Sequence, residues 1–302
     1  MAQALSLPQK PRPHHWRAVG LEDTSARGKH HVRHDRLAHL HSDDVLVIPR
    51  HTAGTIEAMR PVGAFVADVL TQVSEAATPG ANLLDLDEFA HELIRTSGAT
   101  SCYIDYHPSF GGSPFGKVIC TSVNDAALHG LPHNYTLQAG DLLSLDFAVS
   151  LGGWVADSAL SLVVGNQGSV EDQRLIDTCE RALIAGINAA TPGNRLGDIS
   201  AAIGAVSKAA GYLVNTDFGG HGVGRTMHED PSIPNDGTPG TGPVLKPGMV
   251  FAIEPWLMNS TDEIYTAEDG WTLMSADGSR SAHVEHTVAI TKNGPLVLTE
   301  RT

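Results

Sequence analysis

Four acidic residues interrupt or close apolar runs of this 302-residue chain. Asp146 lies in LLSLDFAV, Asp157 in WVADSAL, Glu254 in MVFAIEP and Glu285 in HVEHTVAI. Runs of this length and composition are typical of β-strands, and a carboxylate buried there without a partner is costly. One such residue is more often a strand-end carboxylate than a ligand. Four would each need an ion pair, whereas convergence on metal satisfies all of them, so we predict a metal site.

A histidine framed by glycines completes the candidate ligand set. His221 stands in the segment GGHGVGR, and glycines let the backbone approach a site closely. Two aspartates, two glutamates and one imidazole form an oxygen-rich set, which favours manganese, iron(II) or cobalt and leaves zinc open. Carboxylates can bridge, so two divalent metal ions about 3.5 Å apart could share a hydroxide and polarise a carbonyl group.

Two further histidines are candidates for proton transfer. His129 stands in the segment ALHGLP and His228 in the segment TMHEDP. A neutral imidazole can accept or donate a hydrogen bond at pH 7, and amide hydrolysis needs both. Each of them, taken singly, is equally well explained as an ordinary loop histidine.

Composition and charge exclude several classes of protein. With 41% hydrophobic and 18% charged residues, the chain has the composition of a soluble globular protein. The net charge is −14, and beyond residue 50 only twelve basic residues face 29 acidic ones. Phosphate contacts dominate affinity for nucleic acids, so we expect no DNA binding. An acidic body suits a metal site or a cationic ligand such as a free amino terminus, although it also serves solubility alone.

The sequence also predicts the compartment. No run of about 18 apolar residues could span a membrane, and the N-terminus does not read as a secretory signal. The three cysteines form no CxxC pair, which argues for a reducing compartment. We therefore expect a cytoplasmic protein with no membrane partner.

The chain divides into an N-terminal extension, residues 1–45, and a catalytic domain, residues 46–302. The extension has many histidines and a PxxP stretch, so a polyproline ligand, a metal-sequestering tract and a basic arm that faces the ribosome are all readings of it. We favour a flexible or loosely docked tail over each of these readings. We assign the extension no catalytic role.

An internal repeat at a shift of 113 residues predicts two similar halves. An apolar-periodic helix (55–76), a TPG turn (78–80) and a second amphipathic stretch that ends at Gly98 recur as a helix (171–190), TPG (191–193) and a stretch that ends at Gly211. Pro61 should start the first helix or kink it. We predict strands at 117–123, 142–149, 154–164, 249–254 and 283–291. This order favours an α+β domain, and no GxGxxG segment predicts a dinucleotide cofactor.

The candidate residues lie in segments that resemble a known family. SVNDAALHGLP, GDLLSLDF with WVADS, GGHGVGRTMHEDP, GMVFAIEP and SAHVEHTVAIT are similar, in this order, to the signature segments of type I methionine aminopeptidases, peptidase family M24. The resemblance runs from about residue 46 to the C-terminus. It implies the pita-bread (creatinase/aminopeptidase) fold, in which two pseudo-symmetric α+β halves flank a dinuclear metal site. The histidine- and proline-bearing extension is similar to those of some actinobacterial members.

The resemblance implies a role for each candidate ligand. Asp146 would chelate one metal ion, His221 and Glu254 would bind the other, and Asp157 and Glu285 would bridge both. Glu254 would also be the base for a bridging water.

The resemblance also implies roles for groups around the metal ions. His228 would stabilise the scissile carbonyl oxygen, and His129 would contact the amide nitrogen and assist protonation of the leaving group. The free α-amine of the substrate would sit at the metal ion held by Asp146.

The implied reaction is removal of N-terminal methionine from peptides and nascent chains that have a small second residue. The residues expected in the methionine pocket are Phe115, Cys120, Met227 and Trp271. Met227 stands where an aromatic residue is common in the family, and Ala148 and Ser158 replace threonines. We expect a methionyl aminopeptidase that works as a monomer. The alternatives are a proline-specific aminopeptidase or prolidase of the same fold, and a catalytically silent binding relative.

Overall fold

A computed structural model describes residues 47–108 and 112–301 of the chain, with the side chain of Asn166 left out. The predictions made for the N-terminal extension therefore lie outside the described residues. Within the described residues, no helix has the length and apolar character that crossing a membrane requires.

Four long helices form two pairs, as the repeat predicts. The helices are α1 (Ala53–Ala76), α2 (Leu83–Ser97), α3 (Val170–Ala189) and α4 (Leu196–Ala210). Side chains cap the first turns of α1, α2 and α3, with Thr52, Asn82 and Ser169 each accepting a backbone N–H. The glycines that close α2 and α4, Gly98 and Gly211, both adopt the left-handed conformation. Both halves of the repeat thus have the predicted helix, turn, helix and glycine stop.

The main sheet joins the two halves. Its path in the described part of the chain is β1, β4, β5, β13, β8, β6, β7, with β2 on β4 and β14 on β13. The strands of this sheet are β1 (Thr100–Ser101), β2 (Cys120–Val123), β4 (Leu142–Leu151), β5 (Trp154–Val163), β6 (Gly219–Gly222), β7 (Glu229–Pro234), β8 (Val250–Ile253), β13 (Glu285–Thr291) and β14 (Gly294–Val297). A short 3-10 helix (Val164–Asn166) follows β5.

Two small sheets accompany the main one. The strands β10, β11 and β3 form one, and β12 and β9 form the other. Their bounds are β3 (Ala126–Leu128), β9 (Trp256–Met258), β10 (Ile264–Thr266), β11 (Leu273–Ser275) and β12 (Ser281–His283).

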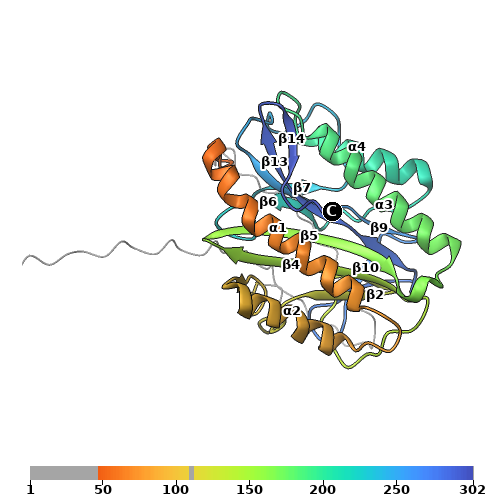
Figure 1. Cartoon of the computed structure of the whole chain (residues 1–302). Coiled ribbons are helices and arrows are strands. Elements are labelled where there is room, and N and C mark those ends of the chain that lie inside the picture. Colours follow the sequence, from red (N-terminus) through yellow and green to blue (C-terminus); the bar gives the residue numbers. More distant parts are fainter. Residues whose placement is uncertain (1–46, 109–111, 302) are drawn as a thin grey trace, which may run out of the picture.

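Each half has its own apolar core beneath its helix pair. Apolar side chains of α1 and α2 pack with those of β4, and apolar side chains of α3 and α4 pack with those of β8 and β13. Figure 1 shows α1 crossing the long strands β4 and β5, while α3 and α4 lie together on the other half. The strands between the two helix pairs can therefore present side chains from both halves to one place.

The predicted elements hold, with local corrections. The helix α1 is capped by Thr52 and contains Pro61, so it does not start at that proline. The strand predicted from residue 117 begins only at Cys120. The glycine-rich segment around His221, which had no predicted strand, forms β6 because β8 supplies its backbone partners.

Candidate active site

The two aspartates lie on adjacent strands in one half of the sheet. Asp146 is in β4 and Asp157 in β5, where the register pairs Asp146 with Ala159 and Asp157 with Ala148. Two residues therefore separate them along the ladder, and side chains at that spacing share a face. Both are buried, with 8% and 4% of their surface exposed.

The other three predicted ligands come from the second half. Glu254 directly follows β8, Glu285 opens β13, and His221 pairs with Ala252 across β6 and β8. His221 Nε2 lies 3.5 Å from Glu254 Oε1 and 4.0 Å from Asp157 Oδ2. The structure thus brings the predicted set together across the central strands.

The His221 ring is oriented for binding through one nitrogen. Its Nδ1 lies 3.0 Å from the carbonyl oxygen of Gly222, which can only accept, so Nδ1 carries the proton. The lone pair of Nε2 therefore faces the carboxylates. Backbone carbonyls commonly fix the tautomer of metal-binding histidines in this way.

The site fits a divalent cation. One ligand atom each from Asp157, His221 and Glu285 lies within 4.8 Å of the others. Glu285 Oε1 is buried without a hydrogen-bond partner among the described residues. A buried carboxylate oxygen without a donor requires compensation, and a cation in this cluster would provide it.

The acidic side chains crowd one another. Burial raises the pKa of Asp157 and of Glu285 well above the ordinary values, and the neighbouring carboxylates raise both further. Burial also acts to raise the pKa of Glu254, but the adjacent imidazoles of His283 and His221 outweigh it and lower that pKa. Glu254 is therefore charged at neutral pH, and a cation would relieve the repulsion that disfavours charge on Asp157 and Glu285.

A buried threonine holds the backbone of Asp157 in place. The hydroxyl of Thr287 accepts the N–H of Asp157 at 2.9 Å and donates to its carbonyl oxygen at 2.7 Å. The register between β5 and β13 covers only Glu285 with Ala159 and His286 with Ser158, so this hydroxyl continues the ladder by one residue.

We expect Thr287→Val to destabilise the protein by about 1–3 kcal/mol, because the isosteric side chain leaves two buried backbone groups without partners. Thermal unfolding would measure the loss. Thr287→Ser keeps the hydroxyl and is expected to retain most of the stability. Equal melting temperatures for Thr287→Val and the wild type would contradict this role.

The two catalytic candidates lie on the same cavity as the ligands. His228 Nδ1 lies 2.9 Å from the hydroxyl of Tyr106, and its ring meets that of His221 edge to face at 4.4 Å. Part of His228 is exposed, yet desolvation and the nearby imidazoles lower its pKa well below the ordinary value. His129 follows β3 with a φ of 54°, and burial lowers its pKa. Both rings are therefore neutral at neutral pH.

The four predicted pocket residues gather on the cavity as well. Phe115, Cys120, Met227 and Trp271 all line it and are all buried. Phe115 stands edge to face against Trp271 with ring centroids 5.1 Å apart. Cys120 pairs with Asp146 across β2 and β4, which places the apolar wall directly beside a predicted ligand. The cavity, of about 700 Å³, thus joins an apolar recess to an acidic cluster.

Sequence reasoning missed four polar residues at the site. They are Tyr103, Tyr106, His283 and Thr287. Tyr103 donates to Asp146 Oδ1 at 2.6 Å, and His283 Nε2 lies 3.6 Å from Glu254 Oε2. The only hint was position, since His283 and Thr287 flank Glu285 in one apolar run. No pattern in the sequence indicated the two tyrosines.

Known proteins share this sequence and this arrangement. The model of metallopeptidase family M24 matches residues 57–292. Methionine aminopeptidase 1 of Mycobacterium tuberculosis is 44% identical over 260 residues, which cover 84% of this chain and 95% of that protein. The chain belongs to the methionine aminopeptidases of family M24.

Solved structures agree with this assignment. The methionine aminopeptidase of Rickettsia prowazekii aligns with a TM-score of 0.80 at 34% identity, over 84% of this chain and all of that one. That of Thermotoga maritima aligns with the same TM-score at 37% identity, with the same coverage. A prolidase from Pyrococcus furiosus, at 23% identity and a TM-score of 0.66, shares the fold. The predicted α+β pita-bread fold is therefore confirmed, and the chain is a hydrolase of the methionine aminopeptidase family.

Proposed function

We propose that this chain hydrolyses the peptide bond after an N-terminal methionine, with a small residue at the second position of the peptide. One observation carries the proposal. A recess walled by Phe115, Cys120 and Trp271 opens onto the cluster of acidic side chains within a single cavity. Sulfur and aromatic rings make favourable contacts with a thioether, and the acidic cluster lies where the backbone of that residue would follow.

We propose that the five residues Asp146, Asp157, His221, Glu254 and Glu285 hold two divalent metal ions. Their oxygen-rich donor set supports cobalt, manganese or iron(II), and zinc is compatible with it. When bound, such ions supply Lewis acidity toward a carbonyl oxygen and a nucleophilic water at neutral pH.

The protein's own groups would orient the substrate and move protons. No lysine or arginine lines the cavity among the described residues, so a free α-ammonium group meets only acidic and neutral side chains there. Glu254, charged at neutral pH, would accept the proton of the attacking water. His228 would donate a hydrogen bond from Nε2 to the scissile carbonyl oxygen while Nδ1 faces Tyr106, and His129 would contact the amide nitrogen.

A peptidase assay tests the proposed function. Met-Ala, Met-Lys and Ala-Pro peptides are offered to metal-free protein that is reloaded with cobalt, manganese, iron(II) or zinc. Cleavage of Met-Ala well above Met-Lys, and none of Ala-Pro, is the expected result. Cleavage of Ala-Pro alone would instead favour the proline-specific enzymes, whose listed similarity at low identity supports only a shared fold.

Location and partners remain proposals. We propose that the protein acts in the cytoplasm on nascent-chain N-termini, as a monomer, and that the extension is the segment that could contact the ribosome. Light scattering of the full chain tests the oligomeric state. Sedimentation with ribosomes, with and without residues 1–45, tests the contact.

A further inference from the structure

Tyr103 reaches from a loop into the centre of the acidic cluster. It lines the cavity and is only 6% exposed. Its hydroxyl lies 2.6 Å from Asp146 Oδ1 and 3.4 Å from Asp157 Oδ1. A carboxylate can only accept, so the phenol donates, and the short distance is typical of a hydrogen bond to a charged acceptor.

The backbone around Tyr103 fixes where this hydroxyl lies. The residue follows β1, whose Ser101 pairs with Val149 of β4, the strand that carries Asp146. The N–H of Tyr103 donates to the hydroxyl of Ser101 at 3.1 Å, and its carbonyl oxygen accepts from the N–H of Tyr106 at 2.9 Å. The next constraint is the side chain itself.

The ring of Tyr103 is confined as well. It packs edge to face against Phe115 with ring centroids 5.6 Å apart. A tyrosine ring has only two side-chain torsions, so backbone anchoring and ring packing together leave the hydroxyl few alternatives to Asp146. The contact is therefore a built feature of the site.

We propose that Tyr103 is a positioning residue that holds the Asp146 carboxylate in the orientation in which it binds metal. This inference rests on the proposed function, since it takes Asp146 as a ligand. The phenol occupies one lone pair of Oδ1 and leaves Oδ2 and the remaining lone pair of Oδ1 to a cation. Hydrogen-bond partners of ligating side chains orient them, and losing such a partner typically weakens metal affinity by about 10- to 100-fold.

Tyr103→Phe isolates the hydroxyl, because it keeps the ring against Phe115. Metal-free protein is titrated with Co²⁺ alone, and both the heat of binding and the visible absorption of the bound cobalt are recorded. We expect a dissociation constant about 10- to 100-fold weaker for one of the bound ions and an altered absorption spectrum. An unchanged or tighter dissociation constant would overturn the proposal.

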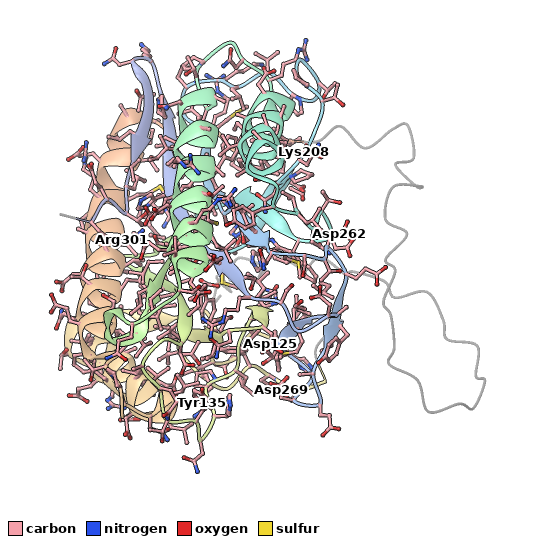
Figure 2. The ribbon with its side chains drawn as sticks, turned by 90° about the vertical axis from the view of Figure 1, so that its right-hand side faces the viewer. Asp125, Tyr135, Lys208, Asp262, Asp269 and Arg301 are labelled. Atoms are coloured by element: carbon pink, nitrogen blue, oxygen red, sulfur yellow. The ribbon has the colours of Figure 1, made fainter. Side chains whose placement is uncertain are left out.

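Tyr135→Phe is a matched control. The hydroxyl of Tyr135 also donates to a carboxylate, Asp141 Oδ2, at 3.0 Å, but this pair does not line the cavity. Tyr135 lies at the lower end of the molecule in Figure 2. Its variant is expected to bind Co²⁺ like the wild type. Equal weakening in both variants would mean that any lost tyrosine hydroxyl perturbs the site, and would also overturn the proposal.

Peptide cleavage separates this inference from the proposed function. With Met-Ala, the activity of Tyr103→Phe should be low at limiting Co²⁺ and should recover toward the wild-type level at saturating Co²⁺. A wild type that binds no metal or leaves Met-Ala intact would defeat the proposed function itself. An active wild type beside a Tyr103→Phe protein with the same cobalt affinity would defeat only the role of Tyr103.

Discussion

Glu254→Ala protein is expected to lose cleavage of Met-Ala peptides by at least about 10³-fold while it keeps its fold. Glu254 is the predicted ligand whose pKa the neighbouring imidazoles hold low, so it is the group best able to accept a proton from water. Alanine removes both that base and one metal ligand. The specificity constant for Met-Ala at saturating metal measures the loss.

Two comparisons make this result specific. Circular dichroism and the melting temperature of the metal-free variant should match the wild type or exceed it, since one of four crowded carboxylates is gone. Glu268→Ala removes an exposed carboxylate that does not line the cavity and should leave cleavage unchanged. Wild-type cleavage rates in Glu254→Ala would refute the assigned base.

Asp157→Asn is expected to stabilise the metal-free protein and to abolish its stabilisation by metal. Burial and the adjacent carboxylates raise the pKa of Asp157 well above the ordinary value. Its negative charge therefore opposes folding at neutral pH, and a neutral amide of the same shape removes this cost. We expect a gain of about 1–3 kcal/mol, since each unit of pKa shift corresponds to about 1.4 kcal/mol. For a chain of this size, about 2–4 °C in melting temperature corresponds to each kcal/mol.

The same cause predicts how stability depends on pH. Asp157 and Glu285 have raised pKa values in the folded state, so their contribution to stability is fully present below the unfolded values near 4. It is lost as the pH rises through the raised values. The gain in melting temperature on adding Mn²⁺ should accordingly be larger at pH 7.5 than at pH 5.

Thermal unfolding with and without Mn²⁺ at the two pH values tests both statements. Asp68→Asn, an exposed change on α1, is the matched control and should behave as the wild type does. A metal-free Asp157→Asn protein that is less stable than the wild type, or one that Mn²⁺ still stabilises fully, would contradict the prediction.

The candidate ligands could be found from the sequence because each one breaks a local pattern. Asp146, Asp157 and Glu285 stand in apolar strand runs, and His221 stands among glycines. Burial follows from the run and its cost from the charge, so convergence on a cation is the economical reading without any coordinates. The two helix pairs were equally local, since the TPG turns and the glycine stops mark where each helix ends.

Strand register and tertiary contact decided the rest. Tyr103 meets Asp146 across 43 residues of chain, and Thr287 meets Asp157 across 130. Neither residue departs from its local pattern, since a tyrosine near a strand and a threonine in one are both ordinary. Their roles exist only because β1 pairs with β4 and because the ladder between β5 and β13 stops one residue short of Asp157. The sequence thus determined which side chains carry the charge, while the fold alone decided which neutral groups hold them in place.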